Sequence, residues 1–242
     1  MSLFSITKSL KSLKPPTCTA VIAAAGISQR CEGEDKLFYT VNDKPILAYT
    51  IEAFESSDLV NDIIIVAHDK RIDSIGKLCL EYKFKKVSKI MKGGSTRLES
   101  VMNGVYAASK KARLIAIHDG ARPCIDKELI DKTIHKAAKY NAAAPAIAIS
   151  STLKRIKDNI IQETVSREDL YEIQTPQIFR AELIKAALTN AHKKKIDTTD
   201  DCMAVEIINV PIHIVTGSRK NIKITDNQDF RIVEAYLNEE FY

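Results

Sequence analysis

Continuous apolar runs recur along most of this chain, each bounded by turn-forming residues. Runs rich in small and β-branched side chains are typical of strands that are covered on both faces. They lie at residues 17–25, 61–67, 113–118 and 142–149. Because such strands usually pair in parallel, the pattern predicts a parallel sheet at the centre of the fold.

Helical patterns lie between these runs. Apolar residues recur at intervals of three and four over residues 96–109 and again over residues 127–139. Strands that alternate with helices predict an α/β fold, here a Rossmann-like, doubly wound and mostly parallel sheet. Right-handed crossovers place ligand sites at the carboxyl ends of such strands, so the site is expected there.

One segment interrupts the alternation. Residues 151–162 contain two short β-like runs on either side of Asp158-Asn159, a pair that favours a hairpin turn. We therefore expect a projecting β-hairpin arm at about residues 150–165. A two-stranded arm has little stability alone, which predicts a homodimer formed through it.

The remaining organisation is simple. Residues 1–16 carry three lysines and no acid, and they are expected to form a flexible N-terminal extension. No internal repeat or low-complexity linker divides residues 17–242, so they are expected to form a single domain with the arm as its appendage.

Composition narrows the possible partners. Of the 242 residues, 36 are Lys or Arg and 31 are Asp or Glu, so the net charge is +5. This mild excess suits an acidic small molecule, and we interpret the lysine-rich stretches 82–92 and 193–195 as solvated faces rather than a nucleic-acid surface. No apolar stretch approaches the roughly 20 residues of a membrane helix, so no membrane partner is expected. The five cysteines form no CxxC pair, which favours free thiols in the cytoplasm over disulfides or zinc.

The first candidate site follows the first apolar run. Small residues at a strand end let the backbone approach a ligand closely, and Gly26 permits the turn that this requires. Backbone N–H groups at such a turn can hold phosphate oxygens, and Arg30 and Lys36 add positive charge. A tight turn with two surface cations would give the same sequence. The segment has neither the GK[ST] of a Walker A loop nor the GxGxxG of a dinucleotide-binding turn.

The second candidate site is the start of a helix. Gly93-Gly94 precede a helix that is expected to begin near Thr96, with Ser95 as its cap. A helix start opened by glycines can bind an anion or the edge of a base. An ordinary capped helix would need the same residues.

The third candidate site lies at the end of the third run, where a ligand site of this fold belongs. Asp119 there could bind a sugar hydroxyl or a metal, and Arg122 could bind phosphate with two parallel hydrogen bonds. The two residues could equally form a local ion pair. We interpret His118 as a buried, hydrogen-bonded residue rather than a base.

Four polar motifs occupy the second half of the chain. They are TVSR at residues 164–167, QTPQ at 174–177, TTDD at 198–201 and NIKIT at 221–225. Each alone is compatible with a turn, a strand before proline, a helix cap or an exposed lysine. Their order together with the earlier motifs is more specific.

The motifs AAGISQR, GGSTRLES, HDGARP, TVSRE, QTPQ, TTDD and NIKIT occur in this order between residues 20 and 225. In this the sequence resembles the 2-C-methyl-D-erythritol 4-phosphate cytidylyltransferases of non-mevalonate isoprenoid biosynthesis. The resemblance implies that a phosphate oxygen of the substrate attacks the α-phosphorus of CTP in line. Pyrophosphate then leaves, and 4-diphosphocytidyl-2-C-methyl-D-erythritol is formed. Mg²⁺ bridging the CTP phosphates is implied as the cofactor, with no metal-binding residue assigned.

The resemblance also implies roles for residues at the matching positions. Those implied to stabilise the transition state around the α-phosphate are Arg30, Lys36 and Lys223. Those implied to bind the nucleotide are Ala24, Ala25, Gly26, Gly93, Ser95, Ser100 and Asp119. Those implied to bind the polyol phosphate, in part from the arm of a neighbouring subunit, are Thr152, Arg167, Thr175 and Arg122.

The loop before Lys36 departs from the family pattern. Ser28 stands where the family usually has glycine, and Asp35 stands where a proline usually precedes the lysine. An acid beside Lys36 is expected to lower the local positive potential.

Two other functions remain open at this point. A ribitol 5-phosphate cytidylyltransferase shares the first loop, the QTPQ and the NIK segment, and its substrate is also a small polyol phosphate. A non-catalytic nucleotide-binding module could use the same fold, although it would not need the cations that this chain retains at Arg30, Lys36, Arg122, Arg167 and Lys223.

Overall fold

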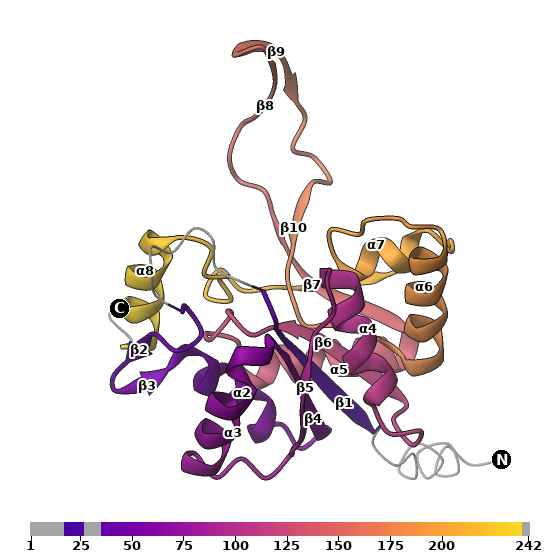
Figure 1. The fold of residues 1–242 in the computed structure, drawn as a ribbon. Helices are drawn as coiled ribbons and strands as arrows, with labels where there is room; N and C mark the ends of the chain where they lie inside the picture. Colours follow the sequence, from indigo (N-terminus) through magenta and orange to yellow (C-terminus); the bar gives the residue numbers. More distant parts are fainter. Residues whose placement is uncertain (1–16, 27–34, 239–242) are drawn as a thin grey trace, which may run out of the picture.

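The computed structural model describes residues 17–26 and 35–238. Within these ranges eight strands form one sheet, with helices on both of its faces (Figure 1). The strands are, in spatial order, β10 (Tyr171–Ile173), β7 (Ala142–Ala148), β11 (Gln177–Arg180), β6 (Leu114–Asp119), β1 (Cys18–Ala24), β4 (Val60–Ala67) and β5 (Val87–Lys92), while β12 (His213–Thr216) pairs with β7.

The centre of the sheet is parallel. Strand β1 pairs in parallel with both β4 and β6, and β4 pairs in parallel with β5. Strand β11 lies antiparallel between β6 and β7, and β10 is antiparallel to β7. The predicted α/β fold with a mostly parallel sheet is confirmed, and the two antiparallel insertions are additions to it.

Two apolar cores explain why the central strands read as continuous apolar runs. Along β4, Ile63 and Ile65 belong to the core on one face of the sheet, whereas Ile64 and Val66 belong to the core on the other. The helices that contribute to the first core are α2 (Ile46–Ser56), α3 (Ile72–Glu81), α5 (Lys127–Tyr140) and α8 (Asn227–Leu237). Those that contribute to the second are α4 (Arg97–Ala107), α6 (Ala181–Lys193) and α7 (Asp201–Glu206). A strand with a core on each face has no solvent-facing side, so it does not alternate with polar residues.

The arm is an antiparallel hairpin of β8 (Leu153–Lys157) and β9 (Ile160–Val165) that projects from the sheet (Figure 1). Its turn residues, Asp158 and Asn159, have φ angles of 51° and 61°. Positive φ at both central residues is the signature of a type I′ turn, whose twist matches that of the strands it joins. The predicted hairpin and its turn are therefore confirmed. A second small ribbon pairs β2 (Thr40–Val41) with β3 (Lys44–Pro45).

The strands and helices predicted from the apolar patterns all form. The lysine-rich stretch 82–92 also contains β5, an edge strand whose Lys89 and Lys92 are exposed, so only part of that stretch is a solvated face. The predicted N-terminal extension lies outside the described residues. Among the helices that are described, none is long and apolar enough to cross a membrane.

Candidate functional site

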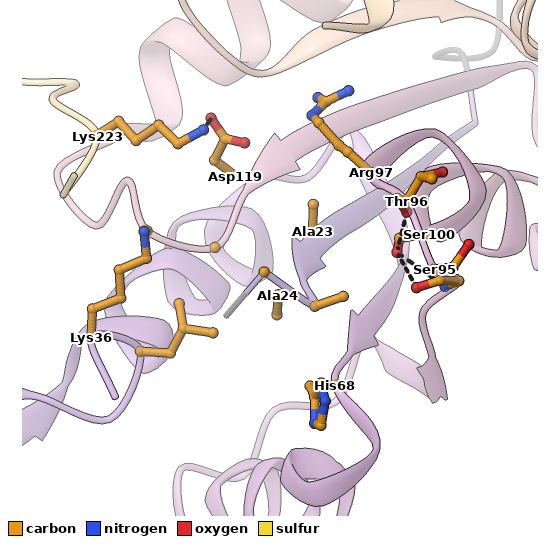
Figure 2. Close-up of a pocket in the computed structure, with 16 residues that line it drawn as sticks. Ala23, Ala24, Lys36, His68, Ser95, Thr96, Arg97, Ser100, Asp119 and Lys223 are labelled. Atoms are coloured by element: carbon orange, nitrogen blue, oxygen red, sulfur yellow. Dashed lines mark hydrogen bonds and ion pairs between the residues drawn. The ribbon is translucent and has the colours of Figure 1, made fainter. Parts of the chain in front are cut away.

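A cavity of about 590 Å³ opens at the carboxyl ends of β1 and β6 (Figure 2). Its position agrees with the expectation for a doubly wound sheet. The described residues that line it are Ala23, Ala24, Ala25, Gly26, Lys36, Leu37, His68, Gly94, Ser95, Thr96, Arg97, Ser100, Asp119, Gly120, Ala121 and Lys223. This set contains eight of the predicted site residues, and it draws them from segments far apart in sequence.

The turn after β1 is held in place by an arginine from the η1 helix (Asp69–Arg71). The guanidinium of Arg71 donates hydrogen bonds to the carbonyl oxygens of Ala24, at 3.2 Å, and Gly26, at 2.9 Å. It also forms an ion pair with Asp35. The acid at position 35 therefore braces this turn, and its charge is compensated by Arg71.

The start of α4 forms the opposite wall of the cavity. The Ser100 hydroxyl accepts a hydrogen bond from the Gly94 N–H at 3.0 Å and donates one to the Thr96 carbonyl oxygen at 2.9 Å. The expected cap was wrong by one residue, because the Thr96 hydroxyl accepts from the Glu99 N–H at 3.1 Å and thereby caps the helix. The Ser95 side chain instead donates to the Glu99 carboxylate.

Gly93 lies directly behind this wall. A Cβ atom at Gly93 would lie 2.7 Å from both the Ala25 Cβ and the Ser100 hydroxyl oxygen. Only glycine permits this approach, so Gly93 sets the distance between the turn after β1 and the start of α4 without itself lining the cavity.

Two lysines reach the cavity from opposite ends of the chain (Figure 2). The Lys36 ammonium donates to the Ile224 carbonyl oxygen at 3.0 Å. The ammonium of Lys223 lies 3.1 Å from Oδ2 of Asp119. Lys36 thus binds the backbone of the NIKIT segment one residue after Lys223. Arg30, the third predicted cation, lies outside the described residues.

Asp119 is the acid of the cavity, and it is almost fully buried. Burial would raise the pKa of its carboxyl group, but the charges of Lys223 and Arg122 outweigh burial and hold the pKa well below its usual range. Arg122 Nε donates to Asp119 at 3.1 Å, and Arg122 Nη1 donates to the Asn221 carbonyl oxygen at 2.8 Å. Arg122 is 7% exposed, so its guanidinium is committed to Asp119 and to the NIKIT segment.

A buried network supports Asp119 from behind. The Thr175 hydroxyl accepts from the Asp119 N–H at 3.2 Å and lies 3.0 Å from Nδ1 of His118. The Asn221 side chain donates to the Thr175 carbonyl oxygen at 2.8 Å. Burial lowers the pKa of His118 to about 3, which keeps the imidazole neutral. The interpretation of His118 as a buried, hydrogen-bonded residue is confirmed, and Thr175 lies in the same network rather than among the residues that line the cavity.

The two predicted substrate residues of the arm lie elsewhere. Thr152 and Arg167 are both exposed and lie at the base of the β8–β9 hairpin, before β8 and after β9. The Arg167 guanidinium donates to the Ser150 carbonyl oxygen. Neither residue lines the cavity of its own chain, and the arm points away from the body of the protein (Figure 1).

Comparison with known proteins places this arrangement in a family. The family model for 2-C-methyl-D-erythritol 4-phosphate cytidylyltransferase matches residues 18–239. The chain belongs to that cytidylyltransferase family. A cytidylyltransferase of this name from Clostridium acetobutylicum is 40% identical over 223 residues, which cover 91% of this chain and 97% of the relative. One from Halalkalibacterium halodurans is 38% identical over 223 residues, covering 92% and 97%.

Solved structures agree. The 4-diphosphocytidyl-2C-methyl-D-erythritol synthase of Anaerococcus prevotii matches with a TM-score of 0.82 at 29% identity, covering 93% of this chain and 97% of that one. The 2-C-methyl-D-erythritol 4-phosphate cytidylyltransferase of Thermus thermophilus matches with a TM-score of 0.76 at 27% identity, covering 91% and 98%. The sheet and the arm described above are therefore those of a cytidylyltransferase.

Some lining residues of this cytidylyltransferase were not predicted as site residues, and among them are Arg97, which carries a positive charge, and His68. Arg97 lines the cavity at the start of α4, and the carboxylate of Asp201 binds its guanidinium through two hydrogen bonds of 3.0 and 2.7 Å. Asp201 belongs to the TTDD motif, whose acids were noted without a role. The only signal was the presence of an arginine and a buried acid in two distant motifs, and no spacing connects them.

Proposed function

We propose that this protein transfers the cytidylyl group of CTP to 2-C-methyl-D-erythritol 4-phosphate and releases pyrophosphate. The observation that carries the proposal is the convergence of Lys36, Lys223 and Asp119 on one cavity at the ends of β1 and β6. Its volume of about 590 Å³ suits a ligand the size of a nucleotide. The family names of its relatives describe the same reaction.

The reaction requires the protein mainly to supply positive charge and to position the two ligands. The attacking phosphate oxygen is already an anion, so no general base is needed, and negative charge grows on the oxygens of the α-phosphate. Lys36 and Lys223, with Arg30, would stabilise that charge in the transition state. Because His118 is buried, neutral and bonded within the protein, it offers no competing base.

The two ends of the cavity suit the two parts of the nucleotide. The small residues Ala24, Ala25 and Gly26 leave room for the phosphates and ribose beside the backbone. Ser95 and Ser100 at the start of α4 lie where they would contact the base, and Gly93 keeps that wall close to the turn. Asp119 would then face the ribose or the polyol.

Binding of the polyol phosphate would be completed by a second subunit. Thr152 and Arg167 are exposed on the arm and do not reach their own cavity, so their proposed role requires the cavity of a neighbour. Ile156, Ile160 and Ile161 of the arm are each more than 60% exposed, an apolar surface that a dimer would cover. We therefore propose a homodimer. Thr175 and Arg122 would support this end of the site by fixing Asp119.

Mg²⁺ is proposed as the cofactor, held by the phosphates of CTP. Mg²⁺ at such sites keeps several waters and takes only one or two carboxylates from the protein. Among the described residues no group of three or more His, Cys, Asp or Glu side chains could hold a metal. Asp119 is nonetheless an ionised carboxylate on the cavity wall, which fits a single contact to a phosphate-held ion. When bound, Mg²⁺ supplies charge neutralisation on the leaving pyrophosphate.

The test is a comparison of substrates. Pyrophosphate release should require CTP and 2-C-methyl-D-erythritol 4-phosphate together with Mg²⁺, and should be far slower with ribitol 5-phosphate. Turnover of ribitol 5-phosphate alone would transfer the proposal to that substrate. No turnover of either, with CTP still bound, would favour a non-catalytic nucleotide-binding module. A cytoplasmic location stays a prediction.

A further inference from the structure

Arg97 extends from the first turn of α4 to the cavity on the same side as Asp119 and Lys223, above Ala23 in Figure 2. Its side chain is 31% exposed, whereas its partner Asp201 is 1% exposed. The guanidinium is therefore anchored from the protein side and open on the cavity side. Nη1 and Nη2 are used in the two bonds to Asp201, and Nε takes no part in them.

A second layer fixes the anchor. The side-chain oxygen of Gln177 accepts from the backbone N–H groups of Asp201 and Cys202, both at 2.9 Å. The Gln177 amide nitrogen donates to Asp200 at 2.8 Å. Gln177 is 1% exposed and lies on β11 directly after Pro176. The QTPQ and TTDD motifs thus meet to hold one carboxylate under Arg97.

The charge around Arg97 decides what kind of ligand group it suits. Burial would lower the pKa of its guanidinium, but Asp201, Asp119 and Asp200 together raise it above the usual value. The positive charge is already compensated by these acids, so Arg97 is a poor centre for a phosphate dianion. Lys36 and Lys223 also line the cavity and can meet the phosphate requirement there. Lys223 pairs with Asp119 through a single contact of 3.1 Å, whereas Arg97 uses both terminal nitrogens on Asp201. A fixed N–H donor of compensated charge is suited to a neutral oxygen, such as a hydroxyl.

We propose that Arg97 is a further binding residue of the transfer reaction, donating to a ligand hydroxyl, and that Asp201 is its positioning residue. The proposal rests on the proposed function, in which two ligands carry hydroxyl groups: the ribose of CTP and the polyol phosphate. Both ligands could place a hydroxyl oxygen in the part of the cavity between Asp119 and the start of α4. The fork to Asp201 fixes the direction of the donor, which a lysine at this position would not reproduce.

The experiment couples a protein change to a ligand change. Wild type and Arg97→Gln are assayed with CTP, 2′-deoxy-CTP and 3′-deoxy-CTP, and separately with the polyol phosphate and its deoxy analogues. In wild type, loss of the hydroxyl that Arg97 binds should raise KM about tenfold or more. In Arg97→Gln the KM for the complete ligand should already be raised about tenfold, and removing the same hydroxyl should change it no further.

The two sets of analogues identify which ligand supplies the hydroxyl. Coupling to a CTP analogue assigns the ribose, and coupling to a polyol analogue assigns the polyol. Effects that add independently for every analogue, or an unchanged KM in Arg97→Gln, overturn the proposal. Arg97→Lys should not restore KM. Arg180→Gln is the matched control, since Arg180 pairs with exposed Glu182 at 3.7 Å and does not line the cavity.

Two further measurements keep the outcome clear. Arg97→Gln leaves the Asp201 carboxylate buried without a partner and could fail to fold. In that case the double variant Arg97→Gln, Asp201→Asn, which removes the buried charge, is assayed in place of the single variant. Calorimetric titration of CTP and of the polyol phosphate into the full chain measures the same coupling without turnover. If the wild-type protein is inactive but Arg97 and the ligand hydroxyl still show coupling in binding, only the proposed function is contradicted. If the wild-type protein is active but shows no such coupling, only the role of Arg97 is contradicted.

Discussion

The ammonium of Lys223 is held by Asp119, with 3.1 Å between Nζ and Oδ2. Arg122 approaches the same carboxylate oxygen at 3.1 Å and ties it to the backbone of the NIKIT segment that carries Lys223. Asp119, Arg122 and Lys223 thus form one unit in which the acid sets the position of the lysine. Because the pKa of Asp119 is held well below its usual range, the carboxylate remains ionised at neutral pH and the lysine stays directed at the cavity.

Removing this lysine tests the proposed chemistry most directly. Lys223→Ala should lower kcat by a factor on the order of 10², because one preorganised charge near the reacting phosphate is lost. The measurement is pyrophosphate release at saturating CTP and polyol phosphate. Lys220→Ala, which removes an exposed lysine directly before the NIKIT segment, is the control and should keep near-normal kcat. Near-normal turnover of Lys223→Ala would remove it from the mechanism.

The arm is tested by its effect on one substrate. Arg167→Ala should raise KM for the polyol phosphate about tenfold or more and leave KM for CTP little changed, because a charged hydrogen bond to one ligand is lost. Initial rates with each substrate varied in turn measure this split. The control is Arg155→Ala, which removes an exposed arm arginine that pairs with Glu163. Equal effects on both substrates would place Arg167 elsewhere.

A mixing experiment tests whether the arm acts across subunits. Arg167→Ala and Lys223→Ala lie on different chains of a mixed dimer, so one of its two sites would have a normal cavity and a normal arm. At a polyol phosphate concentration below the KM of Arg167→Ala, co-refolded or exchanged mixtures should then be more active than the sum of the two variants. Mixtures no more active than the sum of the two variants would contradict a site shared between subunits.

The central strands could be predicted because burial on both faces leaves a signal in a single segment. Ile63, Ile64 and Ile65 have no solvent-facing neighbour, so the run is apolar whatever lies around it. Strand β5 gives no such signal, because its lysines face solvent at the edge of the sheet. Strand β11 has four residues after Pro176, and its pairing between β6 and β7 depends on partners far away in sequence.

The site was predicted from a resemblance of ordered motifs, whereas the geometry came only from the structure. Nothing local connects Lys223 with Asp119, or Arg97 with Asp201, because each pair is joined through the folded sheet. The role of Asp35 shows the same limit. From its place beside Lys36 in the sequence, Asp35 was expected to lower the positive potential at that lysine. In the structure its carboxylate pairs with Arg71 and braces the turn after β1.

Two helical glycines predict opposite effects of the same substitution. A Cβ at Gly104 in α4 would lie 2.4 Å from Val21 Cγ1 and 2.7 Å from Val66 Cγ2. Gly104→Ala should therefore lower the free energy of unfolding by about 1–3 kcal/mol, through overpacking against the sheet. At Gly76 in α3 the nearest atom lies 4.0 Å away, so Gly76→Ala should raise it by up to about 1 kcal/mol through helix propensity. Urea unfolding measures both, and equal shifts would contradict the packing argument.

His118 predicts how stability depends on pH. Burial lowers its pKa from 6.5 to about 3 in the folded protein, so between these values the unfolded chain binds a proton that the folded one does not. Stability should therefore fall as the pH drops below about 6.5, by at most about 1.4 kcal/mol per pH unit from this group. Asp119 adds its own loss only near and below its ordinary pKa of 3.8, so it contributes little over the window from pH 6.5 to 4.5.

The substitution His118→Gln removes that proton while keeping a side chain that can bond to Thr175 or to the Arg122 carbonyl oxygen. The variant should be less stable than wild type at pH 7.5 because its packing is altered. Its free energy of unfolding should nevertheless fall less steeply between pH 6.5 and 4.5, so the two curves converge as the pH drops. His192→Gln, which removes an exposed imidazole, should follow the wild-type slope. If the free energy of unfolding depends on pH in the same way for His118→Gln and wild type, His118 binds its proton equally in the folded and unfolded states. That result would contradict the effect expected from its burial.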